Sequence, residues 1–164
     1  MKCLVVYYSR TGITRGVARA VAEALGAEVE ELIDTKKRSG PLGFAVACKD
    51  AAMKKLVPIE PPKHNPADYD LVVIGTPVWA GTMSSAVRAY LTDHGKQIRS
   101  AALFCTTHTS GIEESKRDMR AMLGCGVIAT AGFREKAVKR GEHIAALDAF
   151  IEKCRLGPSP AEES

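Results

Sequence analysis

Long apolar runs, dense cysteine patterns and grouped histidines are all missing from this 164-residue sequence. No apolar run reaches the roughly 18 residues that a membrane-spanning helix requires, so we expect no membrane span. The apolar stretch that follows Met1 is too short for a secretory signal. The five cysteines include no CxxC pair and the four histidines are scattered, which disfavours a disulfide framework and a metal site. We therefore expect a soluble, cytoplasmic protein with reduced thiols.

Aromatic residues are also scarce, at 5% of the chain, and the excess of positive charge is small. Lys and Arg total 23 against 19 Asp and Glu, and a mildly basic, solvated surface explains the net charge of +4. The densest basic cluster is Lys36-Lys37-Arg38, in a predicted loop. A nucleic-acid reader would need a basic face and more aromatic residues for base stacking, so we expect no nucleic-acid partner.

Short apolar runs alternate with helical patterns along the chain. Residues 3–8 form a β-branched and aromatic run that predicts a strand buried on both faces. Apolar residues every four positions from Ile13 to Leu25 then predict an amphipathic helix, which Gly26 closes. Further strands are expected at residues 28–33 (an edge position), 69–75, 101–105 and 126–131, with helices at 84–91, from 110 onward and at 144–154.

This order of elements predicts an α/β fold: a three-layer, doubly wound domain with a five-stranded parallel sheet. We expect residues 1–156 to form the domain and residues 157–164 to form a flexible C-terminal tail. Residues 35–69 are less regular, with one predicted helix near 44–56 followed by several prolines. Ligands of such sheets bind at the carboxyl ends of the strands, so the segments after strands one, three and four are the candidate site.

The segment after the first strand is rich in hydroxyl groups and begins a helix. The unpaired N–H groups of a helix N-terminus favour a phosphate, and hydroxyls add further donors. Neither the GxxxxGK[ST] nor the GxGxxG pattern is present, which excludes two common phosphate loops. An ordinary turn with a hydroxyl cap is the alternative. The residues concerned are Ser9, Arg10, Thr11, Gly12, Ile13 and Thr14.

The segments after strands three and four offer a flat surface and a polar edge. Trp79 is the only Trp of the chain, and it either lies against a planar ring or plugs the top of the core. His108 either contacts the same ring or is an exposed loop residue. Ser110 and Glu113 have the spacing of a capping box. The candidate residues are Pro77, Val78, Trp79, Ala80 and Gly81 in the first segment and Thr106, Thr107, His108 and Gly111 in the second.

Residues 5–14, residues 69–81 and the polar segment after Cys105 together resemble the flavodoxin family, over about residues 2–154. The resemblance implies the strand order 2-1-3-4-5 with non-covalently bound FMN at the switch point. It assigns Ser9, Thr11 and Thr14 to the phosphate, Trp79 to one ring face, and residues 106–108 to the other side and the pyrimidine edge. It also implies that the Ala80–Gly81 peptide hydrogen-bonds the protonated flavin N5.

The resemblance implies an FMN-binding electron-transfer protein that cycles between quinone, semiquinone and hydroquinone states with redox partner proteins, a reductase and an acceptor. Whether it is an enzyme stays open, because an NAD(P)H-dependent quinone or FMN reductase on the same fold is the alternative. A receiver-like interaction domain without flavin is a further alternative. That domain would need an acidic cluster after strand one and an aspartate ending strand three, where this chain has Ser9-Arg10-Thr11 and Gly75-Thr76-Pro77.

The sequence departs from the family pattern in three places. The chain is basic where flavodoxins are typically acidic, so we expect a less negative potential for formation of the anionic, fully reduced flavin. His108 stands where an aromatic residue often stacks. Residues 40–55 form an additional segment, which is either a flap over the flavin or an association surface.

Overall fold

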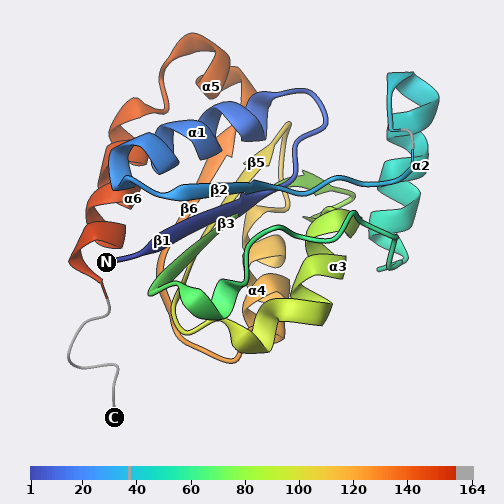
Figure 1. The fold of residues 1–164 in the computed structure, drawn as a ribbon. Helices are drawn as coiled ribbons and strands as arrows, with labels where there is room; N and C mark the ends of the chain where they lie inside the picture. The colour runs from blue at the N-terminus through green and yellow to red at the C-terminus, as the bar shows by residue number, and fades with distance from the viewer. Residues whose placement is uncertain (37, 158–164) are drawn as a thin grey trace.

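The computed structural model describes residues 1–36 and 38–157 and shows an α/β fold built on one parallel sheet (Figure 1). The strand order is β2-β1-β3-β5-β6, which is the expected order 2-1-3-4-5 with one small strand inserted in the numbering. Lys37 and the part of the expected tail from residue 158 onward lie outside the described residues. The parallel strands are β1 (Cys3–Tyr7), β2 (Glu28–Glu31), β3 (Leu71–Trp79), β5 (Ala101–Thr107) and β6 (Val127–Arg134).

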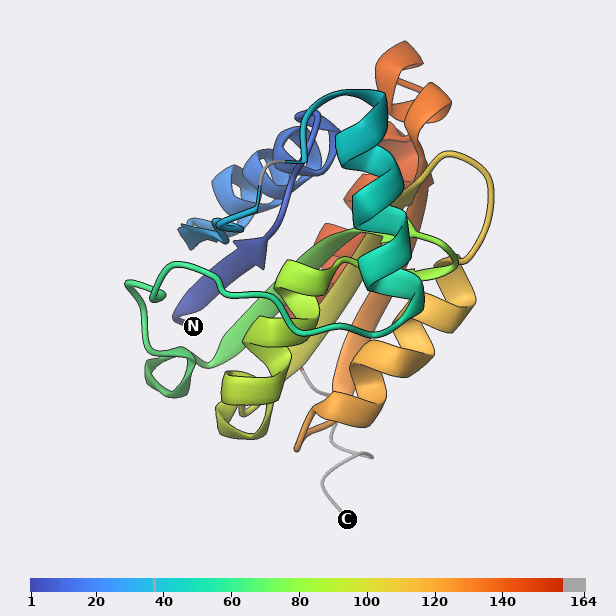
Figure 2. The ribbon, with the colours of Figure 1, turned by 90° about the vertical axis from the view of Figure 1, so that its right-hand side faces the viewer.

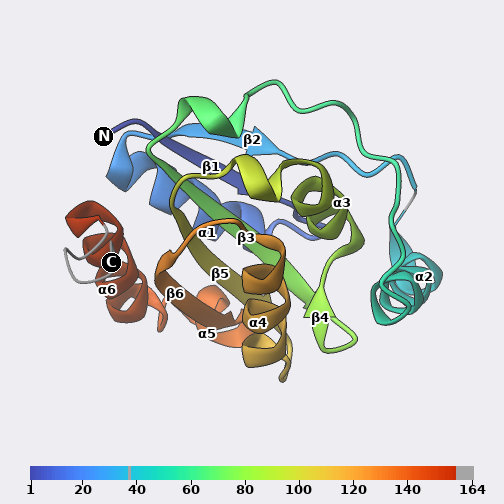
Figure 3. The ribbon, with the colours of Figure 1, turned by 90° about the horizontal axis from the view of Figure 1, so that it is seen from below.

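Helices cover both faces of the sheet, so the three expected layers are confirmed (Figure 3). On one face lie α1 (Ile13–Leu25), α5 (Glu135–Arg140) and α6 (Ile144–Leu156); on the other lie α2 (Gly40–Ala52), α3 (Ser85–His94) and α4 (Ile112–Met122). Two short 3-10 helices, η1 (Pro66–Asp68) and η2 (Gly95–Gln97), precede β3 and β5. The sequence analysis did not anticipate α5, a six-residue helix whose residues are all at least partly exposed.

Alternate residues of β1 enter two separate hydrophobic cores. Leu4 and Val6 belong to the core beneath α3 and α4, whereas Val5 and Tyr7 belong to the core beneath α1 and α6. This alternation follows from the period of two in a β-strand, and it explains why the run is apolar at every position. The edge position predicted for the glutamate-rich second strand is also confirmed, since β2 ends the sheet.

The third strand is longer than the sequence suggested, and this changes the shape of the predicted loop. Residues 76–79 continue β3, with Pro77 opposite Thr106 of β5, and only residues 80 and 81 form a turn before β4 (Thr82–Met83). The expectation of a loop after Gly75 was therefore wrong. Pro77 has turn-like character, but it is buried in the sheet, where pairing with β5 outweighs that local tendency, and Thr76 has the β-branched side chain that strands favour.

The predicted helix in the irregular segment exists, but it begins and ends earlier than expected. Helix α2 starts at Gly40, with Pro41 in its first turn. It lies beyond the carboxyl ends of the strands, at the right of Figure 1, and Figure 2 shows this side of the molecule from the front. Ala47 and Ala51 are buried against the domain, while Leu42 and Val46 are exposed. Its position next to the candidate site bears directly on the function of this segment.

Candidate functional site

A cleft of about 300 Å³ opens where β1, β3 and β5 end. Most of the predicted site residues line it: Arg10, Thr11, Ile13, Thr14, Pro77, Val78, Trp79, Ala80, Gly81, Thr107 and His108. Ser9, Gly12, Thr106 and Gly111 lie outside the lining. Four further residues line the cleft: Thr109 and Ser110, which lie within the predicted polar segment after Cys105, and Phe44 and Glu135, which were not predicted as site residues. Of these, Phe44 and Glu135 come from α2 and α5, and no motif in the sequence connects either helix to the three polar segments.

The turn after β1 presents hydrogen-bond donors at the start of α1. Gly12 precedes the helix with a φ of 97°, a left-handed conformation suited to glycine, and its N–H donates to Ser9 Oγ at 3.0 Å. The first helical hydrogen bond runs from Gly16 N–H to the Gly12 carbonyl. The N–H groups of residues 13–15 therefore have no carbonyl acceptor within the helix. Together with the exposed Thr11, they form a donor set suited to an anion.

The side chain of Thr14 makes a hydrogen bond within the protein. Its Oγ1 lies 2.8 Å from Thr106 Oγ1, and both residues are buried. This hydrogen bond joins the first turn of α1 to the end of β5. Ser9 Oγ likewise accepts from Gly12 N–H. Two of the three hydroxyls that the resemblance assigns to the phosphate thus also hold the turn in shape.

The tip of the β3–β4 hairpin forms the opposite side of the cleft. Ala80 and Gly81 have φ values of 49° and 77°, as in a type I′ turn of two residues, and Trp79 pairs with Thr82 across it. Gly111 lies against this turn: a Cβ atom there would be 2.7 Å from Val78 Cγ1 and 2.8 Å from Gly81 Cα. The loop after β5 and the hairpin tip therefore pack backbone to backbone.

The close approach of Gly111 also explains why the predicted capping box is wrong. Gly111, with a φ of 92°, precedes α4, and no side chain caps that helix. The Ser110 carbonyl instead accepts a hydrogen bond from Thr107 Oγ1 at 2.7 Å. The residue before α4 must adopt a left-handed backbone conformation, which glycine does at little cost. Gly111 therefore occupies the N-cap position that the capping box would have given to Ser110.

Trp79 is too deeply buried to offer the full face of its indole ring to a bound planar ring. Its residue is only 3% exposed, and its ring meets the ring of Tyr8 edge to face with centroids 5.3 Å apart. The guanidinium carbon of Arg38 lies 5.8 Å from the centre of its ring. Burial also raises the pKa of the Tyr8 hydroxyl to about 12, so that side chain is neutral. Trp79 reaches the cleft, but most of its surface belongs to the core.

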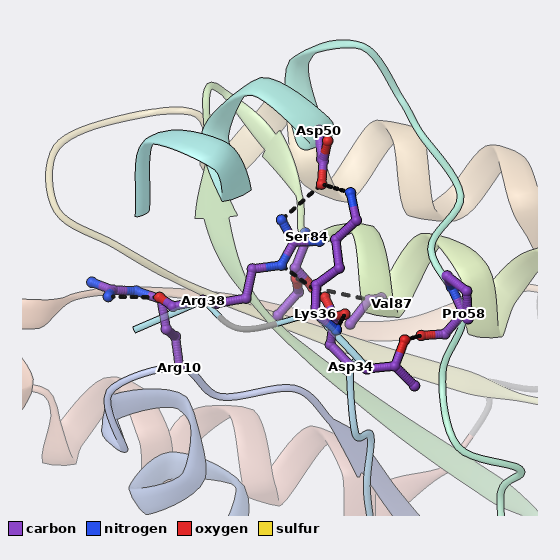
Figure 4. A network of polar contacts seen from close by, with 10 residues as sticks. Arg10, Asp34, Lys36, Arg38, Asp50, Pro58, Ser84 and Val87 are labelled. Atoms are coloured by element: carbon purple, nitrogen blue, oxygen red, sulfur yellow. Dashed lines mark hydrogen bonds and ion pairs between the residues drawn. The ribbon is translucent and has the colours of Figure 1, made fainter. Parts of the chain in front are cut away.

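A buried ionic cluster around Arg38 holds α2 against the domain (Figure 4). Arg38 Nε donates to Asp34 at 2.9 Å and Arg38 Nη1 donates to Asp50 of α2 at 2.8 Å, and the three side chains are almost fully buried. Lys36 Nζ also donates to Asp50, at 2.9 Å. The predicted solvated role of the basic cluster was therefore wrong for Arg38, because Asp34 and Asp50 offset the cost of burying its charge.

The pKa values of this cluster follow from the same contacts. Burial lowers the pKa of Arg38, but hydrogen bonds to Asp50 and Asp34 outweigh burial, and its pKa is raised above the usual value. Burial raises the pKa of Asp50, but Lys36 and Arg38 outweigh it and lower the pKa of this carboxyl below 3.8. Arg38 and Asp50 are thus charged at neutral pH, and the ion pair between them holds α2.

Arg10 connects this cluster to the cleft. Its Nη1 donates to the Arg38 carbonyl at 3.3 Å (Figure 4). Its guanidinium carbon lies 4.7 Å from the centre of the Phe44 ring. Phe44 comes from the second turn of α2 and is partly buried against the core. A loop residue predicted for a phosphate is therefore held against an aromatic ring from a helix that the motifs did not implicate.

The far end of the cleft contains an exposed histidine and a partly buried acid. The side chain of His108 is 69% exposed, and its Nε2 lies 3.2 Å from Glu135 Oε2. Cys105 is fully buried at the end of β5, and burial raises the pKa of its thiol to about 12. That thiol is unsuited to nucleophilic chemistry. The site therefore offers hydrogen-bond donors, one cation and apolar walls, which fit an anionic group joined to a planar ring.

Comparison with known proteins agrees with this geometry. The family described as Flavodoxin matches residues 2–143. A flavoprotein from Lactobacillus acidophilus, solved in complex with FMN, is 22% identical, with 90% of this chain and 98% of that chain covered and a TM-score of 0.69. Two-electron reduced Megasphaera elsdenii flavodoxin is 18% identical, with coverages of 80% and 85% and a TM-score of 0.53. An NADH:FMN oxidoreductase is 12% identical, with coverages of 99% and 94% and a TM-score of 0.58.

None of the helices in residues 1–36 and 38–157 is both long enough and apolar enough to cross a membrane.

Proposed function

The chain belongs to the flavodoxin family, and from that premise we propose that it binds FMN in the cleft and transfers electrons between redox partner proteins. The observation that carries the proposal is the meeting, in one cleft, of the donor-rich start of α1 with the β3–β4 hairpin tip and the loop after β5. This is the place where ligands bind in doubly wound sheets. We also place the protein in the cytoplasm, because its five cysteines are all free thiols.

The start of α1 is the part of the cleft suited to the phosphate. The N–H groups of residues 13–15 and the hydroxyl of Thr11 provide neutral donors, and the helix dipole adds partial positive charge. Ser9 and Thr14 support this arrangement by hydrogen-bonding Gly12 and Thr106. The role of these residues is to bind the anion in a fixed orientation.

The hairpin tip and the loop after β5 are the part suited to the ring. Val78 and Gly81 lie beside the backbone of Gly111, which keeps this side of the cleft compact. The peptide between Ala80 and Gly81 is our candidate for the contact with flavin N5, because it lies at the exposed tip of the turn. When bound, FMN supplies the redox chemistry, while the protein sets its orientation and electrostatic surroundings.

Titration of the purified protein with FMN and with riboflavin, followed by flavin fluorescence, tests the proposal. We expect FMN to bind more tightly than riboflavin, because only FMN carries the phosphate. Thr11→Ala should reduce this preference by about 10- to 150-fold, the loss of one hydrogen bond to an anion. Thr109→Ala, which removes a hydroxyl in the loop after β5, is the matched control and should leave the preference unchanged. Absence of FMN binding by the wild-type protein would overturn the proposal.

The same purified protein distinguishes a carrier from a reductase. An NADH:FMN oxidoreductase shares this fold, so direct use of a nicotinamide is a specific alternative. We expect no steady oxidation of NADH or NADPH by the FMN-loaded protein in the absence of a partner reductase. Sustained oxidation of either nucleotide would assign the protein to the reductase class.

A further inference from the structure

We propose that Arg10 and Phe44 together form the ring-facing wall of the cleft, in which Phe44 holds the guanidinium group and Arg10 supplies a fixed positive charge beside the flavin ring. The inference rests on the proposed FMN-binding function. It assigns a role in cofactor binding to α2, the segment that the sequence left open as either a flap or an association surface.

Trp79 has little surface left to offer to a ligand. It is 3% exposed, with the Tyr8 ring and the Arg38 guanidinium packed against it. Phe44, in contrast, is only partly buried and lines the cleft directly. The aromatic wall of the cleft is therefore supplied largely by α2.

Arg10 is held in place at two points. Its Nη1 donates to the Arg38 carbonyl, and the Phe44 ring lies 4.7 Å from its guanidinium carbon. Arg38 is itself fixed by Asp34 and Asp50. The beginning of α2 is pressed against the same residue, since a Cβ at position 43 would lie 2.5 Å from the Arg38 carbonyl carbon. Arg10 therefore keeps its position without a contribution from the ligand.

Arg10 also supplies positive charge to the cleft. The charged or titratable side chains that line the cleft are Arg10, His108 and Glu135, and Glu135 lies within 3.2 Å of His108. Within residues 1–36 and 38–157, Arg10 has no ion-pair partner. Two electrons and one proton convert oxidised flavin to a reduced ring with one negative charge. A fixed cation favours that anion, so Arg10 should make the two-electron potential less negative.

The competing role for Arg10 is direct binding of the phosphate, because it belongs to the turn before α1. The two roles differ in their effect on riboflavin, which has the ring and lacks the phosphate. A ring-facing Arg10 contributes to the affinity for both flavins, whereas a phosphate-binding Arg10 contributes to the affinity for FMN alone.

The experiment uses the full chain with three substitutions: Arg10→Gln, Phe44→Leu and the control Arg19→Gln. Arg19 is exposed on α1 outside the cleft, so its replacement removes the same charge at a distance from the site. Dissociation constants for FMN and riboflavin are measured by flavin fluorescence. Two-electron midpoint potentials of the FMN-loaded proteins are measured by spectroelectrochemical titration. Circular dichroism melts show which variants fold.

We expect Arg10→Gln to weaken the binding of FMN and riboflavin by the same factor, between about 2-fold and 30-fold, and to shift the midpoint potential to a more negative value. Phe44→Leu keeps an apolar side chain against the core but removes the ring under the guanidinium, so both effects should recur in the same direction and be smaller. Arg19→Gln should change neither quantity. If Phe44→Leu does not fold, Arg10→Gln and Arg10→Lys decide the question, because Lys retains the charge and should retain the potential.

Two results would overturn the inference. One is a loss of FMN affinity in Arg10→Gln with unchanged riboflavin affinity, which assigns Arg10 to the phosphate. The other is a midpoint potential that is the same in Arg10→Gln and Arg19→Gln. Failure of the wild-type protein to bind either flavin is a separate outcome, which removes the proposed function itself.

Discussion

The buried hydroxyl groups of Thr14 and Thr106 lie 2.8 Å apart and join residues separated by 92 positions in the chain. The contact ties the start of α1 to the end of β5, so two segments of the candidate site are held in register by one hydrogen bond. One of the two hydroxyl protons is used between them, which leaves one for a ligand. The site is therefore assembled before a ligand enters it.

A double-mutant cycle at these two residues tests this contact. Thr14→Val and Thr106→Val each leave a buried hydroxyl without its partner, so each should lower the free energy of unfolding by about 1–3 kcal/mol. The double substitution should cost less than the sum of the two, because no unpaired hydroxyl remains. Urea denaturation followed by circular dichroism gives the three values. Strictly additive effects would contradict the proposed coupling.

Replacement of Arg38 by Met should strongly destabilise the protein. Asp34 would lose its only cationic partner among the described residues, and Asp50 would keep Lys36 alone, so we expect a loss of about 3–5 kcal/mol in the free energy of unfolding. Arg155→Met is the control, because Arg155 is half exposed and pairs with an exposed Glu152. It should cost about 1 kcal/mol or less. Similar losses for both variants would contradict the importance of the buried cluster.

The same cluster predicts how stability depends on pH. Lys36 and Arg38 lower the pKa of Asp50 in the folded state below 3.8, so the charged carboxyl stabilises the fold above that pH. This contribution is lost as the pH falls through the lower, folded-state pKa. Urea titrations between pH 7 and pH 2.5 should therefore show the advantage of the wild type over Asp50→Asn shrinking below about pH 4. A constant difference across this range would contradict the assignment.

Sequence patterns predicted the order of helices and strands well, because residues that face the two hydrophobic cores recur at regular spacings along the chain. The helix from Ile13 to Leu25 was predicted with its observed bounds, since its apolar positions recur on one face and a glycine follows. The carboxyl edge of the sheet was correctly taken as the place where the polar segments meet. These features depend on local pattern and on general rules for parallel sheets, and both can be read from one sequence.

The features that the sequence did not reveal depend on contacts between distant residues. Burial of Arg38 requires Asp50, which lies twelve positions away in a helix with no distinctive charge pattern. Phe44 lines the cleft from α2, which that ion pair and the buried Ala47 and Ala51 hold against the domain. Gly111 precedes α4 in place of a serine cap because the backbone of Gly81 leaves no room for a Cβ atom. None of these contacts leaves a periodic signal in the chain.

Gly111→Ala should weaken both stability and flavin binding. The added methyl group would lie 2.7 Å from Val78 and 2.8 Å from the Gly81 backbone, and alanine disfavours the φ of 92°. We expect a loss of about 2 kcal/mol or more in the free energy of unfolding and weaker FMN affinity, because the hairpin tip must shift. Gly126→Ala is the control, since a Cβ there meets nothing within 4 Å. If Gly111→Ala behaves like Gly126→Ala, the two loops do not pack as described.

Ala80→Gly should stabilise the protein, although most substitutions of alanine by glycine do the opposite. Ala80 has a φ of 49°, a left-handed conformation that costs an L-residue about 1–2 kcal/mol and costs glycine almost nothing. The greater freedom of glycine in the unfolded chain removes about 0.4–1 kcal/mol of that gain. The net increase in the free energy of unfolding should therefore be up to about 1.6 kcal/mol by urea denaturation. Ala146→Gly, at an exposed position inside α6, should lower it by about 1 kcal/mol, so opposite signs for the two variants confirm the turn.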